Sequence, residues 1–181
     1  DDLKRDLFYN WGYNPEQYFV PSGWFSQNPK DPYSRLNEVL MLIDEAHKRG
    51  IKVIMDLVVN HTSDEHKWFE ASRDVNSPYH DYYIWRKGKA GGKRPPNNWL
   101  SCFEGGAWEQ DENSKEYYLH VLAKKQPDLN HDNPKVREEV KDIMRFWLDM
   151  GVDGFREDVI TFISKKEGLP NGFPIPAACV V

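Results

Sequence analysis

Two short stretches of the sequence carry ionisable and amide side chains that suit chemistry on a neutral, hydroxyl-rich ligand. They are Asp56 with Asn60-His61, and the later run Gly154-Phe-Arg-Glu-Asp158. Arg156 and Asp158 occupy alternate positions at an expected strand end, so we expect both side chains to point to the same side. A neighbouring guanidinium favours an ionised carboxylate, which is the form that a carboxylate nucleophile needs.

The first stretch follows a segment whose pattern predicts a helix leading into a buried strand. Ser34 is a possible helix cap, and apolar residues recur at helical spacing between Leu36 and Ile43. Gly50 suits the position just after a helix. Residues 51–59 are almost continuously apolar and β-branched, which is typical of a strand buried on both faces.

The second stretch follows the same order of elements. Asn133 is a possible cap, Pro134 suits the first helical position, and an apolar stripe runs from Val136 to Leu148. Gly151 would end this helix before a short strand at residues 152–156. A helix, a glycine, a strand and a charged cluster, repeated, are typical of a (β/α) barrel, in which catalytic side chains lie at the carboxyl ends of the strands.

The predicted fold class is therefore α/β, a fragment of a (β/α)8 barrel with an inserted irregular subdomain. Residues 1–61 and 133–172 would be partial barrel, and residues 173–181 a divergent tail. Residues 62–132 are too many for a plain connection and would form the subdomain, with strands expected at 82–85 and 117–122. A full barrel needs about 250 residues, so we expect the 181 residues to be a segment of a larger enzyme.

The composition argues against a nucleic-acid or membrane partner. With 29 acidic and 24 basic residues the formal net charge is −5, and the one basic run, Arg86 to Arg94, is glycine-rich. No apolar stretch is long enough to span a membrane and no signal peptide is visible, so a cytoplasmic location is expected. An aromatic content of 14% suits a protein that binds sugars, and equally a large aromatic core.

These two stretches, together with Gln126-Pro-Asp-Leu-Asn130, resemble the signature regions of the alpha-amylase family of glycoside hydrolases. The first matches the region at the end of barrel strand 3, and the second matches the region at the end of strand 4. The third has the form typical of the oligo-1,6-glucosidase-like branch. From about Asp56 to Gly172 the chain is similar to oligo-1,6-glucosidases, alpha-glucosidases and sucrose isomerases, whereas residues 10–35 look more like the pullulanase branch.

The resemblance implies retaining hydrolysis of α-glucosidic bonds in oligosaccharides, with α-1,6 linkages as the substrate. Asp158 would be the nucleophile that forms a covalent glycosyl-enzyme, Arg156 would orient and ionise it, and Asp56 would support Arg156. The other implied contacts are to the sugar in the cleaved subsite: His61 on its 6-hydroxyl, Tyr13 stacked on its ring, and Val159 beside the nucleophile, where enzymes that cut α-1,6 links carry the same residue type.

Asn60 is a calcium ligand in some members of that family, so a structural calcium ion is an option here, although the reaction requires no cofactor. The retaining reaction also needs a second carboxylic acid about 5 Å from the nucleophile. The family carries that acid after strand 5, so the remainder of the barrel is expected to be missing from this chain. The 181 residues alone are expected to be inactive.

Other interpretations remain open at this point. Asp158 and Arg156 could form only a structural ion pair at a strand end, and His61 could be a capping or core histidine. The same covalent intermediate would also serve transglycosylation or sucrose isomerisation. A non-catalytic amylase-like protein is disfavoured, because the residues implied in catalysis are intact and no membrane span is present.

Overall fold

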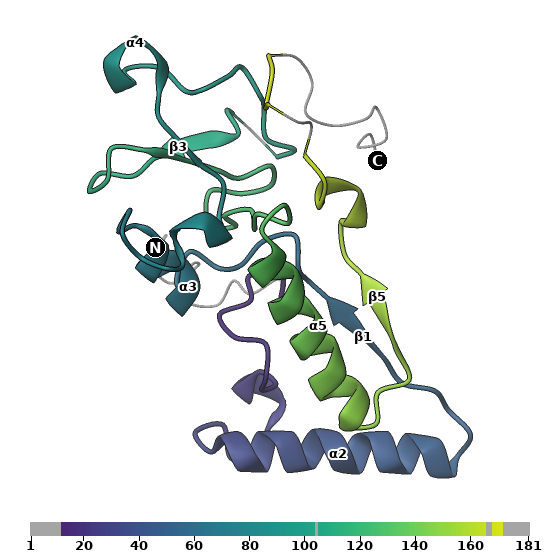
Figure 1. The fold of residues 1–181 in the computed structure, drawn as a ribbon. Helices are drawn as coiled ribbons and strands as arrows, with labels where there is room; N and C mark the ends of the chain where they lie inside the picture. The colour runs from purple at the N-terminus through teal and green to yellow at the C-terminus, as the bar shows by residue number, and fades with distance from the viewer. Residues whose placement is uncertain (1–11, 104, 166–167, 172–181) are drawn as a thin grey trace.

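Two parallel strands carry the residues singled out by the sequence, and two long helices pack beside them (Figure 1). The structure, a computed structural model, describes residues 12–103, 105–165 and 168–171. The helices are α2 (Pro32–Lys48), α3 (Lys67–Ser72), α4 (Lys89–Gly92) and α5 (Pro134–Asp149), with the 3-10 turns η1 (Gly23–Phe25), η2 (His80–Tyr82) and η3 (Ile160–Phe162). The strands are β1 (Ile54–Leu57), β2 (Trp85–Arg86), β3 (Trp108–Gln110), β4 (Tyr117–Leu119) and β5 (Gly154–Glu157).

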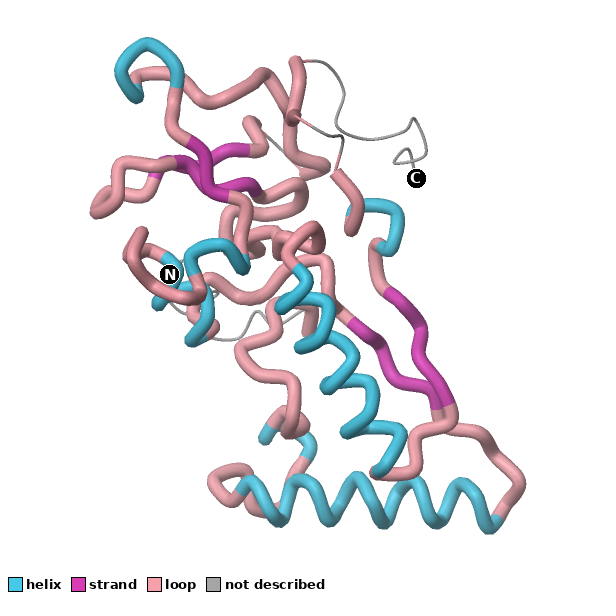
Figure 2. The backbone as a smooth tube through the Cα atoms, viewed as in Figure 1, coloured by secondary structure: helices cyan, strands magenta, loops and turns pink. Residues whose placement is uncertain are grey.

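Strands β1 and β5 form a two-stranded parallel sheet in which Asp56 lies opposite Arg156. Helix α5 lies beside the two strands and α2 crosses beneath it (Figures 1 and 2). A buried apolar cluster joins α2, β1, α5 and the segment before β5: Ile43, Leu57, Val59, Ile143, Trp147 and Val152. The predicted α/β arrangement is therefore present, and the described residues contain two parallel strands rather than a closed barrel.

The helix ends follow local sequence signals, with one correction. The prediction that Ser34 caps the first helix was wrong, because α2 begins at Pro32 and Asp31 is its cap, accepting the backbone N–H of Tyr33 at 3.1 Å. Proline lacks an N–H and has a suitable φ, so it fits the first helical position and moves the start forward. The predicted cap of α5 is confirmed, since the Asn133 side chain accepts the Lys135 N–H.

The glycines expected after each helix adopt the left-handed conformation that only glycine adopts without strain. Gly50 has φ +73° after α2, and Gly151 has φ +96° after α5. The strands that follow are shorter than predicted, with β1 four residues long instead of spanning 51–59. Before β1, the Val53 N–H donates to the Asp153 carboxylate rather than to a strand neighbour.

The chain between β1 and α5 forms a small antiparallel sheet of order β2-β4-β3 with aromatic packing on it. The prediction of a strand at residues 82–85 was largely wrong, because residues 80–82 form η2 and the observed strand, β2, occupies Trp85–Arg86. The strand predicted at 117–122 is confirmed only for its first three residues. The two ends of this segment meet, since His61 and Asp128 form an antiparallel bridge and the Thr62 N–H donates to the Pro127 carbonyl at 3.2 Å.

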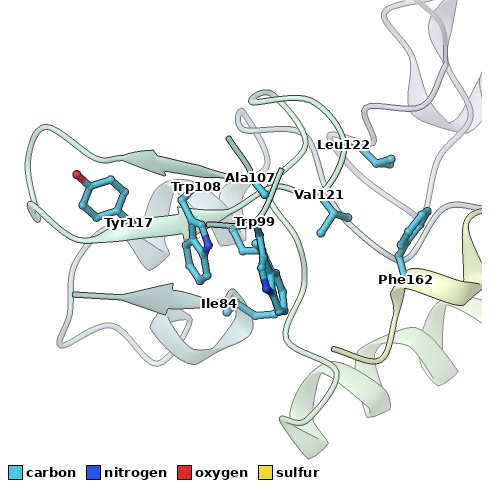
Figure 3. Packing of buried hydrophobic residues seen from close by; sticks show 9 residues of the cluster. Ile84, Trp99, Ala107, Trp108, Tyr117, Val121, Leu122 and Phe162 are labelled. Atoms are coloured by element: carbon cyan, nitrogen blue, oxygen red, sulfur yellow. The ribbon is translucent and has the colours of Figure 1, made fainter. Parts of the chain in front are cut away.

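One buried cluster connects this subdomain to the segment that follows β5. It contains Ile84, Trp99, Trp108 and Val121, and Phe162 from η3 packs against it (Figure 3). The Trp99 indole N–H donates to the Pro170 carbonyl at 2.8 Å, which adds a second tie. The chain that leaves β5 is therefore anchored on the subdomain shortly after the strand ends.

The division at residues 61, 132 and 172 stays a prediction, and the tail expected at 173–181 lies outside the described residues. Within the part of the chain that the structure describes, no helix combines the length and apolar character needed to cross a membrane.

Candidate active site

Arg156 holds two carboxylates together at the carboxyl ends of β1 and β5. Its Nη1 lies 2.7 Å from Oδ1 of Asp158 and 3.2 Å from Oδ1 of Asp56. Asp158 follows the last residue of β5, and its backbone N–H donates to the Leu57 carbonyl at 3.1 Å, which fixes its position against β1. The prediction that Arg156 and Asp158 point to the same side is confirmed by this contact.

The charges in this group are strongly complementary. Desolvation is the largest single effect on the Arg156 guanidinium and lowers its pKa, but the Asp158 and Asp56 carboxylates outweigh it, so the pKa is raised overall. The Asp158 side chain is 13% exposed, against 42% for Asp56. Asp158 is thus largely, but not completely, shielded from water.

Tyr13 lies at the edge of the same group. Its hydroxyl donates to Oδ2 of Asp56 at 3.0 Å, and this hydrogen bond, with the charge of Asp56, raises the pKa of the phenol. Its backbone carbonyl accepts hydrogen bonds from the Gln126 amide at 3.0 Å and from His61 Nε2 at 2.8 Å. The segment carrying Tyr13 is therefore tied to the subdomain side of the site.

His61 is fully buried, and both of its ring nitrogens have partners. A carbonyl can only accept, so Nε2 carries the proton that it donates to Tyr13, and Nδ1 accepts from the Asn60 amide at 3.3 Å. Burial lowers the pKa of His61, in agreement with this neutral form. The implied contact between His61 and a sugar hydroxyl stays a prediction, and it would require the Tyr13 backbone to move away.

Asn60 faces an ammonium group supplied by the chain itself. Its amide oxygen lies 3.1 Å from Nζ of Lys165, which also ion-pairs with Oδ2 of Asp128 at 2.8 Å and donates to the Phe162 carbonyl. Asp128 is fully buried, and the Lys165 side chain is 6% exposed.

The expected calcium option at Asn60 does not fit this arrangement, because a cation already contacts the oxygen atoms that a metal would use. Among the described residues, no His, Cys, Asp and Glu side chains gather in a group that could hold a metal ion. The Lys165 ammonium lies 3.1 Å from the amide oxygen of Asn60, and calcium binding at this residue stays a prediction.

Val159, which directly follows Asp158, has an unusual backbone conformation. Its φ is +45° and its ψ is 37°, in the left-handed region that costs a β-branched residue about 1–2 kcal/mol. Its side chain packs against the subdomain cluster that contains Trp99. The implied effect of Val159 on linkage choice stays a prediction.

Sequence reasoning missed Lys165, and it assigned no role to Gln126 or Asp128. The resemblance of residues 126–130 to a family motif marked the last two, but gave no partner for either. No local pattern connects Lys165 with Asp128, because a buried ion pair between distant positions leaves no periodic trace in one sequence.

The sequence and structure of the chain were compared with those of known proteins, and the comparisons identify its family. The family model described as "Alpha amylase, catalytic domain" matches residues 28–175. The chain belongs to the alpha-amylase family. That membership implies a (β/α)8 barrel and confirms the resemblance inferred from the signature regions.

One curated alpha-amylase relative is an oligo-1,6-glucosidase of Parageobacillus thermoglucosidasius, 59% identical over 145 residues, which are 80% of this chain and 25% of that protein. The isomaltulose synthase of Klebsiella sp. LX3 aligns in structure with a TM-score of 0.79 at 44% identity, covering 91% of this chain and 28% of that one. The trehalose-6-phosphate hydrolase of Bacillus licheniformis aligns with a TM-score of 0.81 at 44% identity, covering the same shares. The chain spans about a quarter of the length of these relatives.

Proposed function

We propose that this chain carries the nucleophile side of the active site of a retaining glycoside hydrolase that acts on α-1,6-glucosidic bonds of oligosaccharides. The observation that carries the proposal is the guanidinium of Arg156, which lies within ion-pair distance of both Asp158 and Asp56. The identity of 59% to a protein named oligo-1,6-glucosidase supports the choice of linkage.

In the proposed reaction an oxygen of Asp158 attacks the anomeric carbon while the bond to the leaving oxygen breaks. The product is a covalent glycosyl-enzyme, which water later opens with the same overall stereochemistry. Arg156 would orient the carboxylate of Asp158, and Asp56 would orient Arg156. The nucleophile and the guanidinium are therefore both in position before the substrate binds. Tyr13 would place its ring against the sugar while its hydroxyl remains on Asp56.

Protonation of the leaving oxygen needs a second carboxylic acid. Asp56 is a poor candidate, because one of its oxygens accepts from Tyr13 and the other faces Arg156. Both oxygens are therefore held by contacts within the protein and are not free to reach a leaving oxygen. We therefore expect the 181-residue chain to leave isomaltose, maltose and sucrose uncleaved.

A substrate that needs no acid tests the nucleophile directly. The chain would be incubated with 5-fluoro-α-glucosyl fluoride, whose fluoride departs without protonation, and its intact mass would be measured. A mass increase of one fluoroglucosyl group, mapped by peptide analysis to Asp158, is the expected result. The variant Asp158→Asn should stay unlabelled, and Glu157→Gln, which changes the neighbouring carboxylate, should label normally.

Label on another residue, or equal labelling of Asp158→Asn, would refute the assignment of the nucleophile. Absence of label in a chain shown by circular dichroism to be folded would favour a non-catalytic role for the segment.

Sucrose isomerisation through the same intermediate is the second candidate, and the likeness to isomaltulose synthase favours it. The two functions differ in what accepts the glucosyl group. When the chain is labelled with plain α-glucosyl fluoride and then given fructose, release of isomaltulose would support the isomerase, whereas release of glucose alone would support the hydrolase.

A further inference from the structure

Thirteen residues between Gly12 and Arg35 line an open hollow, and none of them has a role in the proposed reaction. Its volume is 710 Å³, within the range of about 300–1,000 Å³ that is usual for small-molecule sites. Eleven of its thirteen lining residues precede residue 28, where the alpha-amylase family match begins. Its lining includes none of Asp56, Arg156 and Asp158, so its chemistry is separate from theirs.

The walls of the hollow are held in place by backbone contacts. The Arg35 Nη1 donates to the Pro21 carbonyl at 3.2 Å, and the Ser63 N–H donates to the Pro15 carbonyl at 2.9 Å. A Cβ at Gly23 would lie 2.9 Å from the Pro29 carbonyl oxygen, so only glycine allows this close approach. The hollow is therefore a feature built by the fold.

The lining groups indicate the class of ligand. Glu16 and Arg35 bring opposite charges, which disfavours both a strongly anionic and a strongly cationic ligand. Asn14 and Gln17 add amide donors and acceptors, which suit hydroxyl groups.

An aromatic side chain completes the lining. Trp24 is 68% exposed although it belongs to the wall of the hollow, so its ring is available to a ligand. Sugar rings present C–H groups on one face, and these pack on an indole while the hydroxyls at the ring edge reach polar neighbours. A ring combined with amides and balanced charges fits a neutral sugar better than an aliphatic or ionic compound.

We propose that this hollow is a second carbohydrate-binding site, which holds a glucosyl unit of an α-glucan against Trp24. The neutral polyhydroxylated class follows from the lining, and the choice of a glucan rests on the proposed function. Such a site would hold a longer oligosaccharide on the protein while another part of it reacts.

Titration of the chain with isomaltotriose and with maltotriose, followed by calorimetry and tryptophan fluorescence, tests the proposal. Trp24→Ala should weaken binding about tenfold, since one aromatic contact of this kind is worth about a factor of ten. Phe25→Ala is the matched control, because Phe25 is the neighbouring aromatic residue, is 92% exposed and does not line the hollow. It should change the dissociation constant by less than about twofold.

Asp158→Asn separates this site from the proposed active site. Binding that Asp158→Asn leaves unchanged and Trp24→Ala weakens supports the second site, even if covalent labelling of Asp158 fails. Equal weakening by Trp24→Ala and Phe25→Ala, loss of binding only in Asp158→Asn, or no binding of either trisaccharide at millimolar concentration would overturn the proposal.

Discussion

Replacing Lys165 with methionine should destabilise the chain more than any surface charge replacement. The ammonium is the positive partner of Asp128, whose carboxylate is fully buried between the subdomain and the carboxyl end of β1. Methionine keeps most of the apolar stem and removes the charge. The variant therefore isolates the effect of leaving Asp128 buried without its cation.

The magnitude follows from the geometry. Unit charges 2.8 Å apart attract by about 6 kcal/mol at an effective dielectric constant of about 20, and desolvation of both groups offsets most of this gain. Removing only one partner leaves the other desolvated, which costs about 3–5 kcal/mol. With a urea dependence of about 2 kcal/mol per molar, the unfolding midpoint should fall by about 2 M.

Urea unfolding followed by circular dichroism and tryptophan fluorescence measures this change. The control is Lys48→Met, because Lys48 lies 2.6 Å from Asp44 on an exposed surface and its loss should cost less than about 1 kcal/mol. Adding Asp128→Asn to Lys165→Met should restore part of the stability, since it removes the unpaired charge.

A midpoint for Lys165→Met no lower than that of Lys48→Met would refute the reasoning. Treatment with EDTA should leave the wild-type midpoint unchanged, because the Lys165 ammonium already lies against the amide oxygen of Asn60. A fall on chelation would instead indicate a calcium ion at that residue.

Two further changes test other parts of the structure. Burial lowers the pKa of His66 to about 4, below its unfolded value of about 6.5, so its contribution to stability is complete above about pH 6.5 and is lost as the pH falls toward 4. The variant His66→Asn keeps a side-chain acceptor for the Trp68 N–H. Its urea midpoint should fall less steeply than that of the wild type between about pH 7 and pH 4.5. The same dependence of midpoint on pH in both proteins would contradict this account. Gly151→Ala should cost more than about 1 kcal/mol in urea unfolding, because φ is +96° and the new Cβ would lie 3.3 Å from Ile43, whereas Gly106→Ala, without positive φ or close contact, should cost little.

The helices were predictable because their signals are local. Asn133, Pro134 and the two glycines each specify a helix end through their own backbone chemistry. The cap of α2 was harder to assign, because Asp31 and Ser34 are both residue types that cap helices and lie only three positions apart. Strand ends were less predictable, since a strand continues only as far as its partner does, and the partner of β1 lies beyond the whole subdomain.

The contacts in the candidate site likewise fall into those predictable from local sequence and those that depend on distant segments. Alternation along one strand was enough to place Arg156 beside Asp158. The contacts of Lys165 with Asp128, and of His61 with the Tyr13 carbonyl, join distant segments and depend on tertiary packing. Family resemblance indicated which residues would gather there, but it did not reveal that His61 would be buried or that a lysine would lie beside Asn60.

The meeting of the subdomain's two ends has a consequence for the order of folding. Asp56 and Arg156 are 100 positions apart, and closing a flexible loop of that length costs about 4 kcal/mol in chain entropy. If the subdomain folds first, the bridge between His61 and Asp128 brings its ends together and shortens the effective loop to about 33 residues. The closure cost then falls by about 1 kcal/mol, which corresponds to a roughly fivefold faster pairing of β1 with β5. A subdomain that folds first would therefore favour the pairing that brings Asp56 to Arg156.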